Sequence, residues 1–373
     1  MATGAAVSRG TDPEPLPDGV SSSSEVSLDE LQLSQRNHGM HLEGLRYDVT
    51  PAGMHYLLIH FDVPEADEAS WKLSVDGLVR NPIELSMADL RSRPSVTTTV
   101  TMECAGNGRA RLSPRPISQP WLGEAVGTAE WTGTPLRPLL EEAGPLDGAV
   151  ELVFAGADRG IHKEVEHDYE RSLPIADALG DEVLLAYEMN GDPLPPQHGF
   201  PLRLVVPCWY GMTSVKWLTR ITAVREPFEG FQQLAYRYRQ EPEDDGTPVT
   251  RMDPRSLMIP PGIPDFMTRS RIVDRGRHVL RGRAWSGWGA IERVEVSEDG
   301  GSTWASAELG DAVSPYAWRS WSFDWDARPG VVELCCRAAD TAGNEQPLEP
   351  SWNLGGFSNN AVQRVSVEVR ARA

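Results

Sequence analysis

Cysteine and long apolar runs are scarce in this sequence. Its four cysteines, Cys104, Cys208, Cys335 and Cys336, form no CxxC pair, which argues against a disulfide framework, a cysteine-based zinc site and a thioredoxin-type redox motif. No stretch reaches the about 20 apolar residues that a membrane-spanning helix needs, and residues 1–30 contain neither an apolar signal core nor a twin-arginine pair. We therefore expect reduced thiols, no membrane partner and a cytoplasmic location.

Positive charge is also scarce. Lysine and arginine number 35 against 54 aspartates and glutamates, which gives a net charge of −19. A negative field of this size repels nucleic-acid phosphates and anionic lipid surfaces, so we expect neither as a partner. Hydrophobic residues make up 40% of the sequence, and 34 glycines and 30 prolines are spread along it, as is typical of a soluble, loop-rich globular protein. A length of 373 residues, at roughly 150 residues per domain, predicts two domains.

The distribution of apolar residues divides the N-terminal part into two segments. Residues 1–30 combine prolines, a serine run and surplus acid with hardly an aliphatic side chain, and we expect a disordered tail there. In residues 31–250, strand-like runs alternate with Pro/Gly turns and short helical segments, which predicts a mixed α+β domain. The elements expected in it are strands at Trp71–Val79 and Val96–Met102 and helices at Ser86–Arg91 and Pro135–Ala143.

A polar, proline-rich stretch at residues 239–256 indicates a domain boundary. Residues 251–373 then contain short strand candidates at close spacing, and Asp299-Gly300 supplies the turn of a hairpin. This pattern predicts an all-β sandwich of the immunoglobulin type. The expected strands are Arg277–Trp285, Ile291–Ser297, Thr303–Leu309, Trp318–Asp324, Val331–Ala338 and Val362–Arg370.

Two stretches in the first domain combine side chains that suit chemistry. In TMECAGNGR, residues 101–109, a β-branched strand leads directly into Cys104, and the glycines that follow leave the thiol at the strand end. A thiolate beside cationic groups is a nucleophile or a soft metal ligand, although a small core residue before a turn shows the same local pattern. In QRNHG, residues 35–39, Arg36 suits an oxyanion and His38 suits a hydrogen bond to a ligand, the alternative being an exposed polar loop.

A third stretch, residues 188–217, places basic side chains at both ends of an apolar strand: His198, Arg203 and Lys216. A hairpin with surface charges is the alternative interpretation. The sequence contains no P-loop, GxGxxG, GxSxG or HExxH motif, which argues against nucleotide hydrolysis, nicotinamide chemistry, serine hydrolysis and a zinc site. One soft thiolate with several anion-binding groups remains, and this set fits a metal held by an organic anionic ligand.

Taken in order, the three stretches resemble the motifs of the sulfite oxidase family of molybdenum enzymes, from about residue 34 to the C-terminus. ECAGNGR is similar to the cysteine motif CAGNRR, QRNHG to the RNHG element, and LLAYEMNGDPLPPQHGFPLR with TSVKW to the long second signature. The resemblance implies the molybdenum cofactor, with Cys104 as the metal ligand. It implies that the pterin and its phosphate are held by Asn37, His38, Asp158, His198, Arg203, Ser214, Val215 and Lys216.

The resemblance also implies the substrate side of the site. This would consist of Arg36 and Arg109 for the oxyanion, Trp131 in the pocket and Tyr236, in FQQLAYR, as the active-site tyrosine. Tyr238 would take that place if the register differed. Two departures thin the positive charge: Gly108 stands where the cysteine motif has its first arginine, and residues 314–318 contain no arginine where vertebrate members have a further one.

The resemblance implies oxidation of a small oxyanion, sulfite to sulfate, by oxygen-atom transfer. The sequence contains no CxxCH haem motif, so electrons would pass to an external acceptor, a cytochrome or oxygen, and the C-terminal domain would form a homodimer. Two alternatives stay open. One is a molybdenum-dependent reductase or dehydrogenase for another small oxyanion or S-oxide, which the thinned pocket permits. The other is a non-catalytic binding module built on the tryptophan-rich sandwich.

Overall fold

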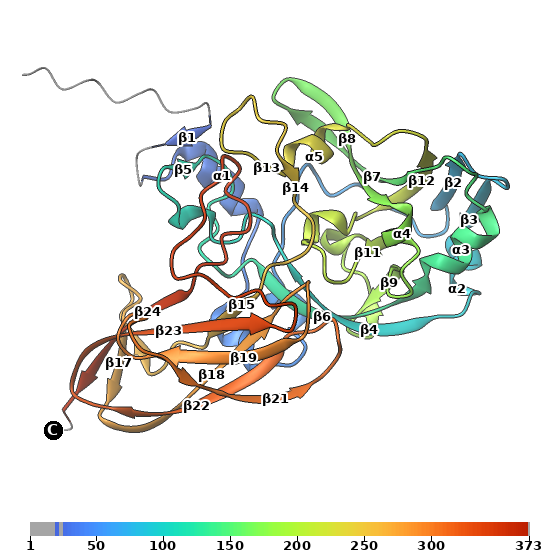
Figure 1. Ribbon diagram of the computed structural model, residues 1–373. Coiled ribbons are helices and arrows are strands. Elements are labelled where there is room, and N and C mark those ends of the chain that lie inside the picture. The colour runs from blue at the N-terminus through green and yellow to red at the C-terminus, as the bar shows by residue number, and fades with distance from the viewer. Residues whose placement is uncertain (1–18, 22–24, 372–373) are drawn as a thin grey trace, which may run out of the picture.

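The structure is a computed structural model, and it describes residues 19–21 and 25–371. Figure 1 shows a mixed region of helices and sheets beside a β-sandwich coloured orange to red. Most of the expected disordered tail, residues 1–30, lies outside the described residues. Among the described residues, no helix combines the length and the apolar character needed to cross a membrane. The α-helices are α1 (Leu28–Arg36), α2 (Met87–Arg91), α3 (Leu136–Ala143), α4 (Ile175–Ala178) and α5 (Phe231–Ala235).

Helix α1 begins inside the segment expected to be disordered. Ser27 caps its N-terminus and forms a capping box with Glu30. The Glu30 carboxylate is buried and ion-paired with Arg115, whose strand β5 (Arg115–Pro116) pairs with β1 (Val20–Ser21). The expectation of disorder is therefore wrong for residues 28–30, because the cap and the buried ion pair order them.

Two five-stranded sheets form the mixed region of the described chain. The first has the order β3-β2-β12-β7-β8, in which β12 runs parallel to β2 and the other neighbours are antiparallel. The second has the order β10-β9-β6-β4, with β11 also paired to β9. The strands are β2 (Lys72–Gly77), β3 (Ile83–Ser86), β4 (Val96–Glu103), β6 (Val126–Pro135), β7 (Glu151–His162), β8 (Val165–Pro174), β9 (Leu184–Met189), β10 (Asp192–Pro193), β11 (Arg203–Val205) and β12 (Leu218–Val224).

The expected elements of this region are present because each has a strong local pattern. Both predicted strands occur, as β2 and β4. Helix α3 buries Leu136, Leu139 and Leu140 in a core that also holds Phe154 of the first sheet and Leu204 of the second, and such spacing at one face is what an amphipathic helix requires. These helices and sheets confirm the α+β class.

The C-terminal region is a sandwich of a four-stranded and a six-stranded sheet within the described residues. The strand orders are β15-β18-β22-β21 and β16-β17-β24-β23-β19-β20. Trp321 and Trp325 of β22 pack against Val294 and Leu334 of the facing sheet, which confirms the expected sandwich, the architecture that immunoglobulin-like domains share. The strands are β15 (Arg255–Met258), β16 (Ile263–Pro264), β17 (Arg271–Asp274), β18 (Gly276–Trp285), β19 (Ile291–Ser297), β20 (Ala305–Ser306), β21 (Glu308–Ala312), β22 (Arg319–Ala327), β23 (Gly330–Asp340) and β24 (Gln363–Arg370).

One predicted strand, Thr303–Leu309, is divided between the two sheets. Strand β20 pairs with β19, and after Ala307 the chain crosses to the other sheet, where β21 pairs with β22. The Ala307 peptide N–H still donates to the Val294 carbonyl at 2.9 Å. The prediction of one continuous strand is wrong because a period-two pattern does not show a change of sheet.

The two regions are joined tightly. A small hairpin of β13 (Arg237–Tyr238) and β14 (Thr247–Pro248) begins just before the stretch expected as a boundary and ends inside it. In addition to this hairpin, one buried cluster combines side chains from both regions. Its members include Met40, Leu45, Ala105, Tyr210, Met252, Leu257, Trp285, Trp318 and Phe357. The division at residue 250 stays a prediction, and the sandwich supplies part of the wall around the Cys104 loop.

Candidate functional site

Cys104 lies where β4 ends and a tight turn begins. Its peptide N–H donates to the Ala125 carbonyl at 2.9 Å, and its own carbonyl accepts from the Asn107 N–H at 2.9 Å. Gly108 follows with a φ of 88°, and a Cβ there would lie 2.8 Å from the Asn359 carbonyl oxygen. Glycine is therefore required at this position by its own backbone and by the close approach of the C-terminal region.

A single pocket brings six predicted residues together. These are Cys104, Asp158, His198, Arg203, Ser214 and Lys216. They come from the ends of β4 and of the 3₁₀-helix η4 (Pro196–His198), from β7 and β11, and from the turn before β12. The rest of the wall consists of His55, Tyr56, Leu57, Leu58, His60, Met102, Tyr169, Gly211 and Met212.

Two cations of this pocket have no carboxylate partner within ion-pair distance in the described part of the chain. The Arg203 guanidinium is buried and donates to the backbone carbonyls of His198 and Ser214 at 3.0 and 3.1 Å. Lys216 donates to two backbone carbonyls at 2.8 and 3.1 Å. Burial and the Arg203 charge lower the pKa of Lys216, while Asp158 opposes them. Positive charge with no carboxylate in direct contact suits an anionic group such as a phosphate.

The Cys104 sulfur is held in an environment that favours a bound metal over a free thiolate. Burial raises the pKa of the Cys104 thiol, while Arg109, the Gly106 peptide N–H and the Trp121 side chain act in the opposite direction. The pKa is raised on balance, so an ionised sulfur here needs a further positive charge. A metal ion supplies that charge and takes a thiolate as ligand.

Arg109 and Tyr236 do not line this pocket, but both contact Phe357, a side chain from the sandwich region. Arg109 donates from Nε to the Gly355 carbonyl at 2.9 Å, and its guanidinium carbon lies 5.4 Å from the centre of the Phe357 ring. The Phe357 ring stacks on Tyr236 with centroids 4.9 Å apart. Burial and the Cys104 charge raise the pKa of Tyr236 to about 12, against the effect of Arg109 and Arg171. The phenol is therefore neutral at neutral pH and able to donate a hydrogen bond.

Comparison with known proteins agrees with this geometry. Models of the oxidoreductase molybdopterin binding domain and of the Mo-co oxidoreductase dimerisation domain match residues 60–232 and 248–370. Over 340 residues the chain is 36% identical to sulfite oxidase of Gallus gallus, an alignment that covers 85% of this chain and 72% of that protein. The chain belongs to the sulfite oxidase family of molybdopterin oxidoreductases.

Other family members show how far the similarity extends. Mitochondrial sulfite oxidase of Mus musculus is 36% identical over 86% of this chain, which spans 62% of that protein. Nitrate reductase [NADH] 1 of Oryza sativa subsp. japonica is 31% identical over 86% of this chain and 38% of its own length. The crystal structure of the sulfane dehydrogenase SoxCD from Paracoccus pantotrophus superposes with a TM-score of 0.76 at 26% identity, covering 100% of this chain and 96% of that one.

The pocket fits the molybdenum cofactor of the sulfite oxidase family. Cys104 offers a soft sulfur of the kind that a molybdenum centre takes as a ligand. Arg203 and Lys216, neither of which has a carboxylate within ion-pair distance among the described residues, suit the phosphate of the pterin. Asp158, His198 and Ser214 complete the polar wall. The resemblance and the geometry thus agree on six of the nine residues expected at the cofactor.

The structure does not bring all the predicted residues of the sulfite oxidase motifs into the pocket. Arg36 ends helix α1, is half exposed, and forms an ion pair with Asp62 at 2.8 Å. The Asn37 amide is buried and donates to Leu33 and Gln119, while its oxygen accepts from a peptide N–H. These side chains hold the N-terminal segment in place.

His38 and Val215 also differ from the expectation. The His38 ring is exposed, although its backbone pairs with Leu57 of the pocket wall. Val215 is fully buried in the core between the sheets and does not line the pocket. Its peptide groups bond to Leu204 and Thr213, so it fixes the turn that carries Ser214 and Lys216.

The predicted pocket tryptophan is a further correction. Trp131 of β6 is fully buried, and the Arg203 guanidinium carbon lies 4.6 Å from its ring centre. Trp121, which the sequence reasoning missed, is the tryptophan whose side chain lowers the pKa of the Cys104 thiol. Tyr238, the competing choice for Tyr236, bonds Ser358 through its hydroxyl. The position of each residue within its motif could be predicted from the sequence. The distance in space between one loop and another could not.

The pocket wall from His55 to His60 was also missed. The segment HYLLIH supplies five lining residues, and two histidines five positions apart after a Pro/Gly turn were the available signal. A larger cavity of about 850 Å³ lies elsewhere, between residues 39–43, 108–124, 255–271 and 348–366. It does not include Cys104, although Gly108, Arg255 and Asn359, which hold the Cys104 loop, line its wall.

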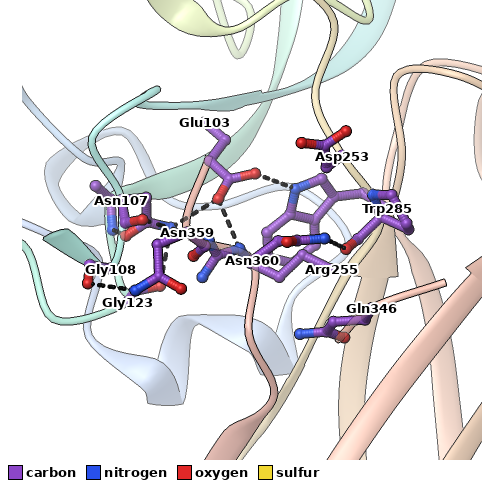
Figure 2. A network of polar contacts seen from close by, with 12 residues as sticks. Glu103, Asn107, Gly108, Gly123, Asp253, Arg255, Trp285, Gln346, Asn359 and Asn360 are labelled. Atoms are coloured by element: carbon purple, nitrogen blue, oxygen red, sulfur yellow. Dashed lines mark hydrogen bonds and ion pairs between the residues drawn. The ribbon is translucent and has the colours of Figure 1, made fainter. Parts of the chain in front are cut away.

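The Cys104 loop is held from the sandwich side by a polar network (Figure 2). The Glu103 carboxylate pairs with Arg255 of β15 at 2.7 Å and accepts from Trp285 Nε1 at 2.8 Å and Asn107 Nδ2 at 2.9 Å. Asn359 Nδ2 donates to the Gly108 carbonyl at 2.8 Å. The residues on both sides of Cys104 are therefore fixed by the second region.

Proposed function

We propose that this protein is a sulfite-oxidising molybdenum enzyme. The observation that carries the proposal is the gathering of Cys104 with Arg203 and Lys216 in one pocket. Arg109 and Tyr236 do not line that pocket, but each interacts electrostatically with the Cys104 sulfur. When bound, the cofactor supplies the two-electron redox chemistry and the oxygen-atom transfer. In the net reaction sulfite gains an oxygen atom from water to give sulfate, with release of two protons and two electrons. The electrons leave to an external acceptor, a cytochrome or oxygen.

The chain's own residues bind and orient the reactants. Cys104 would ligate the metal, and Arg203 with Lys216 would hold the phosphate of the pterin. Arg109 would orient the substrate oxyanion through its guanidinium, which suits a planar arrangement of two hydrogen bonds. Tyr236, neutral because burial raises its pKa to about 12, would donate a hydrogen bond to the substrate or to the oxygen being transferred.

Assembly and location complete the proposal. The match to a dimerisation domain over residues 248–370 supports a homodimer. A cytoplasmic location stays a prediction, as do the nature of the acceptor and the assignment of Arg36, Asn37 and His38 to the site.

The first test measures metal and turnover in one preparation. Molybdenum is determined by elemental analysis in the purified protein, and sulfite-dependent reduction of an artificial acceptor is followed. We expect about one metal per chain and turnover, and we expect Cys104→Ser to abolish turnover because the metal loses its protein ligand. Cys208→Ser is the matched control, because Cys208 lies outside the pocket. Full activity of Cys104→Ser, or a metal-free wild type from a cofactor-competent host, would contradict the proposal.

A reductase for another small oxyanion or S-oxide is the second candidate. It is favoured by the 31% identity to nitrate reductases and by the loss of one motif arginine at Gly108. Metal without sulfite turnover, together with oxidation of a reduced dye by nitrate or an S-oxide, would support it. A non-catalytic module would contain no metal in the same assay.

A further inference from the structure

A short loop of the sandwich region holds apolar side chains out into solvent. It comprises residues 263–270, between the paired strands β16 and β17 at one edge of the six-stranded sheet. Phe266 and Met267 are each 82% exposed, and Ile263 is 66% exposed. Single exposed apolar side chains are common on protein surfaces, but several that gather at one place mark an interaction site.

Hydrogen bonds hold the 263–270 loop in one conformation. At its base, the buried Arg271 side chain donates to the backbone carbonyls of residues 260–262 at 2.8 to 2.9 Å. At its tip, the Asp265 carboxylate accepts from the peptide N–H and the hydroxyl of Thr268 at 2.8 and 2.7 Å. The Asp265 peptide N–H donates to the Ser270 carbonyl at 2.8 Å. Because the backbone is fixed before binding, a partner loses little binding free energy to ordering of the loop.

The larger cavity, of about 850 Å³, lies beside this loop. Its wall includes residues 268–271, whereas Phe266 and Met267 do not line it. The wall also contains Leu122 and Leu348, two further large apolar side chains that are 56% and 39% exposed. An apolar projection and a cavity with exposed apolar side chains in its wall are thus neighbours on one surface, and the projection does not fill the cavity of its own chain.

A projection next to a cavity is a self-complementary arrangement for two copies of one chain. In a twofold-symmetric dimer both copies use the same patch, so the projection of each copy meets the cavity of the other. A small ligand would fill the cavity but leave Phe266 and Met267 exposed, since neither lines it. The loop and most of the cavity wall fall within residues 248–370, the segment that matches the dimerisation domain. These observations favour a second copy of this chain as the occupant.

We propose that the 263–270 loop of each protomer inserts Phe266 and Met267 into the larger cavity of its partner in a twofold-symmetric homodimer. This inference rests on the homodimer of the proposed function and assigns its contact surface. The cavity wall also contains Gly108 and Asn359, which are joined by a hydrogen bond at the Cys104 loop. In the dimer, the partner's loop therefore lies against the segment that holds the Cys104 loop in place.

The first test measures the oligomeric state of the purified full chain by sedimentation velocity over a range of concentrations. It compares the wild type with the double variant Phe266→Asp with Met267→Asp and with the control Ile161→Asp. A carboxylate at either loop position opposes burial in an apolar contact. Both positions are exposed in the single chain, so the substitutions leave its core intact. Ile161 is 70% exposed and lies on β7, outside the segment that matches the dimerisation domain.

We expect the wild type and Ile161→Asp to be dimers of equal stability. In the double variant the dimer dissociation constant should rise about a hundredfold or more, because each copy loses two apolar anchors. A double variant that dimerises as tightly as the wild type would overturn the proposal, and so would a monomeric wild type.

A cross-linking experiment tests the contact without weakening the dimer. Met267→Cys protein is mixed with Ser366→Cys protein, exchanged to form mixed dimers and treated with a short bismaleimide. Ser366 is exposed and lines the larger cavity. The control mixture replaces it with Ser306→Cys, an exposed position on β20 at the opposite edge of the same sheet. Each chain has one introduced thiol, so a link between the two positions joins two copies.

Peptide mass spectrometry identifies the linked positions. We expect a link between positions 267 and 366 in the first mixture and no link between positions 267 and 306 in the control. Absence of the first link, or equal yields of both, would overturn the proposal.

These outcomes are separate from the test of sulfite oxidation, because neither experiment requires turnover. A wild type that dimerises through the loop but does not oxidise sulfite would contradict the proposed reaction alone. A sulfite-oxidising protein whose dimer is unaffected by both aspartates would contradict the assignment of the loop alone. A monomeric wild type that oxidises sulfite would contradict the homodimer and the loop contact, but not the reaction.

Discussion

Two histidines of the Cys104 pocket show how burial sets the charge of single residues. The rings of His55 and His198 meet edge to face with centroids 5.5 Å apart. Burial lowers the pKa of His55 to about 4 and that of His198 to about 2, and the Arg203 charge adds to both effects. Both rings are neutral at neutral pH. They offer one donor and one acceptor each and leave the positive charge of the pocket to Arg203 and Lys216.

These histidines predict a pH dependence of stability. Below the ordinary pKa of 6.5 the unfolded chain binds protons at both rings while the folded chain does not. The free energy of unfolding therefore falls as the pH decreases from 7 to 5, by about 2 kcal/mol for each ring. Urea denaturation of the cofactor-free protein at both pH values measures this. His55→Gln should remove the part of the pH dependence that His55 contributes. The control His41→Gln, at an exposed histidine, should keep the whole decrease in the free energy of unfolding. Equal stability of the wild type at both pH values would contradict the neutral state of the two buried rings.

The predicted site residues that the structure gathers in one pocket lie inside local motifs. Cys104, His198 and Lys216 are fixed by the turn or strand end that contains them, so a short stretch of sequence was sufficient. Trp121 and Arg171 were missed, because their approach to Cys104 and Tyr236 depends on how β6 and β8 pack against other elements. Arg36, which the sequence predicts at the substrate, lies at a helix end and pairs with Asp62, and no local pattern indicates that pairing.

At the scale of elements, the end of β4 is enclosed by the sandwich. Arg255 of β15 pairs with Glu103. In the segment 353–360, the Ser358 peptide N–H donates a hydrogen bond to the Ala105 carbonyl at 2.8 Å. Both partners of the Glu103–Arg255 pair are almost fully buried, with side chains 1% and 4% exposed. A buried pair of this kind depends on both members, because either charge alone is costly.

The pair predicts strong energetic coupling between the two regions. Glu103→Gln is expected to lower the free energy of unfolding by about 3–5 kcal/mol, because Arg255 is left buried without its counter-charge. The double variant Glu103→Gln with Arg255→Met should lose less than the sum of the single losses, which a double-mutant cycle by urea denaturation measures. Asp76→Asn, which breaks the more exposed pair with Arg220, should cost less than about 1 kcal/mol. Strict additivity in the cycle would contradict the coupling.

Elements with a strong local pattern were predictable, and elements set by tertiary contacts were not. Helix α3 and strand β4 follow from apolar spacing and from a β-branched run. The short strands β20 and β21 do not, because the chain changes sheets at Ala307 for reasons of sandwich closure. The β13–β14 hairpin was hidden in a stretch that shows no apolar period.

At the scale of the whole molecule, the described chain behaves as one structural unit with two architectures. The shared buried cluster contains Tyr210 from the first region and Trp285 and Phe357 from the second. Hydrogen bonds such as Trp318 Nε1 to the Asp48 carbonyl at 2.8 Å also cross between the regions. Interfaces with this much buried apolar surface resist separation.

This architecture predicts cooperative unfolding. Calorimetry of the full chain should show a single transition, because neither region retains its core contacts when the other unfolds. Loss of secondary structure by circular dichroism and loss of tryptophan burial by fluorescence should coincide. Two well-separated transitions would show that the regions are independent and would contradict the prediction.

The hydrogen bonds from residues 353–360 to the Cys104 loop also determine the sequence of events during synthesis of the chain. A ribosome releases the chain from its N-terminus, so the loop emerges about 250 residues before the segment that holds the Ala105 and Gly108 carbonyls. Until that segment is made, the nascent loop lacks its final partners. The turn at Cys104 therefore reaches its mature shape only near the end of translation, and insertion of the cofactor is expected to follow completion of the chain.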